Sequence, residues 1–84
     1  AELTCFPNPS TGNFLIAVNN IPDQFKSAQL ECNIYDLAGR RVLSKPLNNG
    51  KQQFDLEGQL NAGIYLVRIS MNNSMIRTTK MIIQ

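Results

Sequence analysis

The side chains that could do chemistry are few in this chain and are spread along its length. Histidine is absent from all 84 residues, which removes the commonest general base, the commonest metal ligand and every Ser–His or Cys–His nucleophile pair. Acid–base catalysis needs two carboxylates that converge in a cleft with separated pKa values. The six carboxylates are too scattered to predict such a pair: Glu2, Asp23, Glu31, Asp36, Asp55 and Glu57. We therefore expect no catalytic residue and no enzyme activity.

Metal and cofactor chemistry has equally little support. Cys5 and Cys32 match no C-x-x-C spacing, and the segment from Asp36 to Gly39 is too short for a calcium loop of about twelve residues. One calcium ion in a loop stays open, but we expect no metal and no cofactor. The two cysteines also leave two alternatives open, either one disulfide or two separate thiols that pack as small hydrophobes.

The basic residues form two groups in the sequence, but the formal net charge is only +2. One group surrounds Arg40 and Arg41, and the other contains Arg68, Arg77 and Lys80. Nucleic-acid-binding modules place aromatic side chains among such charges, whereas we expect most aromatic residues here to lie in the core. The basic residues are more typical of outward strand faces, where they keep a domain soluble and protect sheet edges. We expect no nucleic-acid partner.

Two further absences concern export. No stretch approaches the roughly 18 apolar residues that a membrane-spanning helix needs, so we expect no direct membrane span. Residues 1–9 have neither the basic start nor the apolar run of a signal peptide. If the protein is exported, another segment must bring it to the first membrane, and we expect the chain to be a piece of a longer polypeptide.

Short apolar runs separated by turn signals predict an antiparallel β-sandwich rather than helices. In residues 30–35 apolar and polar side chains alternate, which indicates a half-buried strand. Position in this alternation predicts a core that contains Leu30, Cys32, Ile34, Val42, Tyr65, Val67 and Ile69. A buried Tyr65 would need a partner for its hydroxyl group. The seven predicted strands cover residues 3–6, 14–18, 30–35, 40–44, 52–56, 64–71 and 75–83.

Prolines, glycines and asparagines predict the turns. Pro7 and Pro9 end the first strand, Pro46 ends the fourth, and Asn49-Gly50 is a strong hairpin signal. Asp36 can accept hydrogen bonds from the backbone that follows it, and Gly39 and Gly63 are expected at or near positive φ. We expect an irregular segment before residue 28.

The register of the last hairpin depends on the length of its loop. A two-residue loop at Asn72-Asn73 places Tyr65 opposite Lys80, Val67 opposite Thr78 and Arg68 opposite Arg77, an unfavourable pair of like charges. A three-residue loop shifts the register by one residue and separates the two arginines. The sequence leaves both registers open.

Four segments, in this order, carry a resemblance to a known family. They are FPNPSTGNF at 6–14, IYDLAGRRV at 34–42, LNAGIYLVRI at 60–69 and TKMIIQ at 79–84. Together they resemble the type A C-terminal sorting domain of the type IX (Por) secretion system, over nearly the whole chain. The chain departs from the family pattern at Cys5 and Cys32, where aliphatic residues are more usual, and at Arg41, where a smaller residue is common.

The resemblance implies a seven-stranded Ig-like sandwich at the C-terminus of a secreted or cell-surface multidomain protein. In that family the domain directs an N-terminal passenger from the periplasm through an outer-membrane translocon with its carrier proteins. A cell-surface sortase then typically removes the domain, and the passenger is often linked to an anionic lipopolysaccharide. The family's motif positions correspond here to Pro7, Asn8, Pro9, Gly12, Asp36, Gly39, Gly63, Tyr65, Val67 and Lys80.

Two other functions remain as alternatives to a sorting signal. One is a β-sandwich binding module that docks a carbohydrate, a cell surface or the passenger enzyme of a secreted hydrolase. The other is a structural spacer that caps a hydrolase. The lack of tryptophan disfavours carbohydrate binding, because sugar-binding sandwiches usually expose aromatic platforms.

Overall fold

The computed structural model describes residues 2–21, 29–72 and 74–84, and over these residues the chain is built of β-strands and turns. The predicted irregular segment before residue 28 lies largely outside the described residues. The strands are β1 (Glu2–Phe6), β2 (Asn13–Asn19), β3 (Leu30–Asp36), β4 (Arg41–Leu47), β5 (Lys51–Asp55), β6 (Gly63–Met71) and β7 (Ser74–Ile83). The all-β prediction is confirmed.

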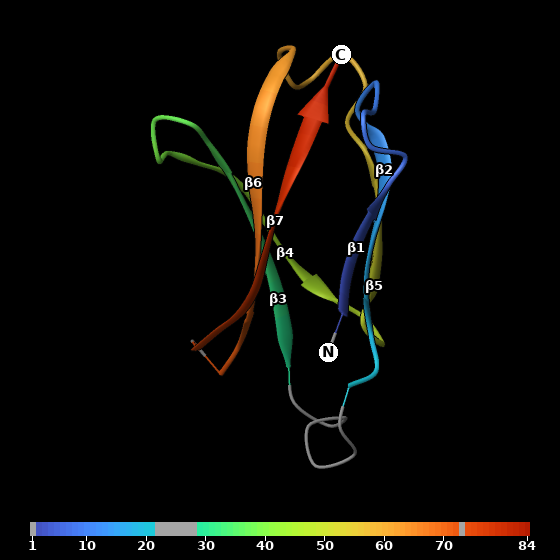
Figure 1. The fold of residues 1–84 in the computed structure, drawn as a ribbon, viewed down its shortest axis with the longest axis vertical. Helices are drawn as coiled ribbons and strands as arrows, with labels where there is room; N and C mark the ends of the chain where they lie inside the picture. Colours follow the sequence, from blue (N-terminus) through green and yellow to red (C-terminus); the bar gives the residue numbers. More distant parts are fainter. Residues whose placement is uncertain (1, 22–28, 73) are drawn as a thin grey trace.

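The strands form two antiparallel sheets that face each other (Figure 1). The three-stranded sheet has the order β1-β2-β5, and the four-stranded sheet has the order β4-β3-β6-β7. Consecutive strands therefore cross between the sheets from β2 to β3, from β4 to β5 and from β5 to β6, as in Ig-like sandwiches. The predicted seven-stranded sandwich is confirmed.

Alternate residues of each strand point into the space between the sheets and form one core. Phe14 and Phe54 from the three-stranded sheet stack with their ring centres 5.1 Å apart. The fully buried Ile34, Val67 and Ile69 come from the four-stranded sheet. Leu30, Cys32 and Tyr65 are buried as well, so six of the seven predicted core residues lie where the alternation places them.

Val42 is the exception, because its side chain is 40% exposed. The cause is a bulge in the pairing of β3 with β4: Ile34 pairs with Leu43, but Tyr35 pairs with Arg41. The extra residue shifts the alternation of β4 by one position. Leu43, and not Val42, therefore packs against the core, and Val42 lies on the outer face of the four-stranded sheet.

The predicted end of β4 at Pro46 was wrong, whereas the turn predicted at Asn49-Gly50 is present. The strand continues through Pro46 to Leu47, because β4 lies at a sheet edge, where a residue without an N–H group is tolerated. Asn49 and Gly50 do form a tight turn, with φ angles of 56° and 75°. The strands that this turn connects belong to different sheets, so it is a link between the two layers and not a hairpin within one.

A second bulge decides the register of the last hairpin. Met71 pairs with Ser74 and Ser70 with Met75, as the two-residue loop predicts. One extra β7 residue, Ile76, then lies between two consecutive pairs, because Ile69 pairs with Arg77. Beyond the bulge Arg68 faces Thr78, Leu66 faces Lys80 and Tyr65 faces Met81. Of the two registers that the sequence left open, that of the two-residue loop holds beside the turn, and that of the three-residue loop holds beyond the bulge. The bulge thus separates Arg68 from Arg77.

Gly39 and Gly63 both have positive φ, 86° and 154°, as predicted, and Gly12 has a φ of 120°. Gly12 is also tightly packed, because a Cβ atom there would lie 2.8 Å from the Cα of Glu57. At Gly39 the same atom would meet nothing within 4 Å. A substitution at Gly39 therefore measures backbone strain alone, whereas one at Gly12 adds steric overlap.

We expect Gly39→Ala to lower the free energy of unfolding by about 1 kcal/mol, the cost of placing alanine at positive φ. Gly12→Ala should cost at least about 1 kcal/mol more, because the neighbouring backbone must also move. Urea denaturation of both variants measures the difference. Equal losses would show that the close approach of Gly12 to Glu57 does not constrain the fold.

Candidate functional site

The motif segments found in the sequence come together at one end of the sandwich. Figure 1 shows the loop after β1, the turn between β3 and β4, the start of β6 and the C-terminus at the same end, whereas the N-terminus lies towards the other. Hydrogen bonds join these segments, and the bonded residues lie up to 74 positions apart in the sequence. We call this end of the molecule, formed by residues 7–12, 36–40, 61–66 and 80–84, the motif end.

The loop after β1 pairs with the outer edge of β7 through the side chain of Asn8. Its Nδ2 donates to the carbonyl of Lys80 at 2.9 Å, and its Oδ1 accepts from the N–H of Ile82 at 2.9 Å. Pro7 and Pro9 have no N–H groups, so Asn8 carries the one backbone donor of residues 7–9. The carboxamide donates one of these bonds and accepts the other, and so takes the place of a peptide group in a neighbouring strand.

Ser10 continues the same pairing with its backbone. Its N–H donates to the carbonyl of Ile82 at 2.9 Å, and its carbonyl accepts from the N–H of Gln84 at 2.8 Å. Its side chain is buried, and its Oγ accepts from the N–H of Gly12 and donates to the carbonyl of Asn13. Ser10 was not among the site residues predicted from the sequence. The available signal was a small hydroxyl residue between a proline and a glycine, which favours a side-chain-to-backbone turn.

Asp36 and Gly39 form the turn between β3 and β4, as predicted. One carboxylate oxygen of Asp36 accepts from the N–H groups of Ala38 at 3.0 Å and Arg40 at 2.9 Å. The other accepts from Nε of Arg40 at 2.9 Å. The bond from the Arg40 N–H is the largest cause that holds the pKa of Asp36 below its ordinary value.

Tyr65 and Val67 belong to the core and not to the surface. Val67 is fully buried, and Tyr65 is 7% exposed. The hydroxyl of Tyr65 donates to the carbonyl of Asn61 at 2.7 Å, which supplies the predicted partner. A tyrosine near the start of this strand that bonds the backbone four residues upstream corresponds to the tyrosine corner of Ig-like sandwiches. It fixes the path of the chain into Gly63.

Lys80 is exposed, and its side chain lies on the outer face of β7. Apart from the half-buried Asp36, which holds its turn, the motif residues fall into two kinds. Tyr65, Val67 and the tightly packed Gly12 hold the shape of the motif end. Pro7, Asn8, Pro9, Gly39, Gly63 and Lys80 are exposed, so a partner can contact them.

Neither cysteine is arranged for chemistry. Both are free, and Cys32 is buried whereas Cys5 is half-buried. Burial raises the pKa of Cys5 to about 11 and that of Cys32 to about 12, so both thiols are protonated at neutral pH. In the described part of the chain, no three His, Cys, Asp or Glu residues gather where they could hold a metal ion. The same residues include no helix that could span a membrane.

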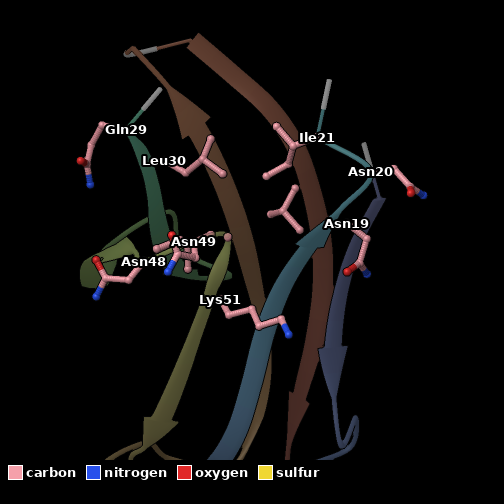
Figure 2. A pocket seen from close by; sticks show the side chains of 11 residues that line it. Asn19, Asn20, Ile21, Gln29, Leu30, Asn48, Asn49 and Lys51 are labelled. Carbon is pink, nitrogen blue, oxygen red and sulfur yellow. The ribbon is translucent and has the colours of Figure 1, made fainter. Parts of the chain in front are cut away.

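A cavity of about 800 Å³ lies at the opposite end, between the sheets. Its apolar lining includes Leu30 and Ile21, which point towards each other in Figure 2, whereas the amides of Asn20, Gln29 and Asn48 point outwards. No aromatic side chain is among the described residues that line it. The described part of the lining therefore offers amides and aliphatic side chains but no aromatic platform.

We expect Asn8→Ala to loosen the end of β7. The variant loses two hydrogen bonds at an exposed site, which should lower the free energy of unfolding by about 1 kcal/mol. Hydrogen exchange of the Ile82 amide should become faster. Asn8→Asp is the matched variant, because it keeps the acceptor for Ile82 and loses the donor for Lys80. Unchanged exchange in both would contradict the pairing.

The Asp36 turn should make stability depend on acid pH. The folded-state pKa lies below the unfolded one, so the stabilisation is complete above the unfolded pKa and is lost as the pH falls through the folded-state pKa. Wild type should therefore exceed Asp36→Asn in stability at neutral pH, and the difference should shrink in acid. Urea denaturation across that range tests this, and a difference independent of pH would contradict it.

Comparison with known proteins identifies a family whose model spans all of the segments that form the motif end. The family model described as "Secretion system C-terminal sorting domain" matches residues 4–84. An endo-acting ulvan lyase of Formosa agariphila is 27% identical over 84 residues, which are 100% of this chain and 15% of that protein. An ulvan lyase of Nonlabens ulvanivorans is 26% identical over 83 residues, 99% of this chain and 14% of that protein.

The match therefore covers a small part of each lyase and nearly all of this chain. Sorting domains are non-catalytic signals, and the proteins that carry them are secreted or remain at the cell surface. This chain belongs to the family of secretion system C-terminal sorting domains, and its function is that of a secretion signal.

Proposed function

We propose that residues 1–84 form one C-terminal sorting domain of a larger secreted protein and direct an N-terminal passenger across the outer membrane by the type IX system. The family match supports this proposal, as does the small share of the ulvan lyases that the chain covers. The passenger is then the part of the protein that carries any catalytic activity.

The observation that carries the proposal is the convergence of the motif segments at one end of the sandwich. Asn8 and Ser10 from the start of the chain bond to Lys80, Ile82 and Gln84 at its finish. Such a surface exists only when the domain is folded. A receptor that recognises it therefore recognises a folded passenger-bound domain and not an extended tail.

The partners that follow from this function are proteins of the secretion machinery. We expect a carrier of the outer-membrane translocon to bind the domain after it reaches the periplasm. A cell-surface sortase then removes the domain from the passenger. This domain needs no cofactor for carrier binding or for cleavage by the sortase, because it acts only as the recognised surface.

Within the motif end, β7 and the adjacent start of β6 supply the side chains that a carrier can contact. The outer backbone edge of β7 at Lys80, Ile82 and Gln84 already bonds to Asn8 and Ser10. Recognition of this strand through its backbone, as an added strand, is therefore blocked there. The exposed side chains of Lys80 and Ile64 remain, and we propose that they are contacted.

We expect Lys80→Ala to reduce export of a reporter fused ahead of residue 1 in a host that has the type IX system. The melting temperature of the domain should stay within a few degrees, because the removed side chain is exposed. Lys51→Ala is the matched control, since Lys51 is an exposed lysine on the three-stranded sheet. Fractionation of periplasm and medium measures the export.

Deletion of residues 80–84 should retain the reporter in the periplasm, but it also removes the buried Met81 and Ile83 and so tests folding together with recognition. Normal export of the deleted fusion would exclude sorting by this strand. In that case binding of ligands by the isolated domain, tested by pull-down, becomes the leading alternative.

A further inference from the structure

The outer face of the four-stranded sheet is divided into an apolar half and a polar half. Towards the motif end its side chains are those of Tyr35, Val42, Ile64, Leu66 and Ile82, which we call the outer apolar face. Further along the same strands the outward positions are polar and include Glu31, Asn33, Ser44 and Ser70.

The strand register makes the apolar half one continuous surface. Tyr35 on β3 pairs directly with Leu66 on β6, and Ile64 pairs with Ile82 on β7. The bulge in β4 adds Val42 beside Tyr35. Val42, Ile64 and Leu66 are 40%, 39% and 37% exposed, although outward positions of a two-layer sandwich are usually polar.

Cations surround this face. The guanidinium carbon of Arg68 lies 5.0 Å from the centre of the Tyr35 ring, Lys80 pairs with Leu66, and Arg41 pairs with Tyr35. The neighbouring carboxylate, that of Asp36, is already bonded to Arg40. A partner that covers the face must therefore offer apolar side chains with carboxylates around them, since such charges complement the arginines and the lysine.

The position of the face leaves it accessible in a fusion. Figure 1 shows the start of β1 away from the motif end, so a passenger fused ahead of residue 1 joins the molecule at a distance from this face. The fold does not need the face either, because the core lies on the opposite side of the same strands.

From these observations we infer that the outer apolar face is the docking surface for a protein of the secretion machinery that presents an apolar patch edged by acidic side chains. The inference rests on the proposed function and extends it from Lys80 and the start of β6 to β3 and β4. Recognition then uses the side chains of all four strands, so that the receptor contacts a folded sheet face.

Val42→Thr/Leu66→Thr is the decisive variant, because threonine keeps the strand preference of the branched residues and removes the apolar contact. We expect export of the reporter fusion to fall by about tenfold or more, as for the loss of an anchoring interface residue. Leu15→Thr is the matched control, since Leu15 is a partly exposed residue on the outer face of the other sheet and lies outside the motif segments. Both purified domains should melt within a few degrees of wild type.

Charge reversal at Arg68 tests the chemistry of the partner. Arg68→Glu should reduce export more than Arg68→Gln, because the glutamate repels a carboxylate that the glutamine merely fails to attract. Equal export of both variants and of wild type would contradict the inference that the partner presents acidic side chains. If Val42→Thr/Leu66→Thr melts many degrees below wild type, its loss of export could reflect unfolding. Ile64→Thr then replaces it as the test, because it changes a single exposed side chain and should also reduce export.

The outcomes separate the inference from the function on which it rests. If the wild-type fusion stays in the periplasm, the proposed function fails. If wild type is exported and the threonine variants are exported equally well, the function stands and this surface is not the docking site. If the wild-type domain binds phosphatidylglycerol vesicles and Val42→Thr/Leu66→Thr does not, the face binds a membrane and the protein partner is wrong.

Discussion

The structure of the motif end depends on which groups form hydrogen bonds with the backbone at the outer edge of β7. An edge strand presents unpaired N–H and C=O groups that invite pairing with another chain. Here the carboxamide of Asn8 and the backbone of Ser10 bond in succession to Lys80, Ile82 and Gln84. The loop after β1 thereby leaves the three-stranded sheet and closes the four-stranded one. The two ends of the sequence become one surface because of these four bonds.

This closure determines which groups of the signal remain available. The backbone of the last strand is occupied at its end, and Tyr65 and Val67 are buried. What the folded domain offers are side chains on one sheet face and the turns around it. Substitutions in the motif should consequently act by two routes. Changes at Gly12, Tyr65 or Val67 alter the shape, whereas changes at Lys80 alter the contacts without altering the shape.

Local patterns sufficed to predict most of the fold. Period-2 alternation located Ile34, Tyr65 and Ile69 in the core, and the Asp36 turn followed from the hydrogen-bonding capacity of aspartate. The misplaced Val42 and the shifted register of Arg68 both result from bulges. A bulge depends on how two strands fit each other, so the alternation within a single strand does not reveal it. The bonds of Asn8 span more than 70 positions and have no local signal either.

The same bulges shape the candidate receptor surface. Without the bulge in β4, and with Tyr35 still opposite Arg41, Val42 would pair with Ile34 and point inwards, and the outer apolar face would end at β3. Without the extra residue in β7, Lys80 would face Tyr65 and not Leu66. Its position beside Leu66 and Arg68 on the outer face is thus set by an irregularity of the strand pairing. If the bulges serve recognition in this way, their loss should leave a stable sandwich that the machinery exports poorly, because the core packs on the other side of the strands.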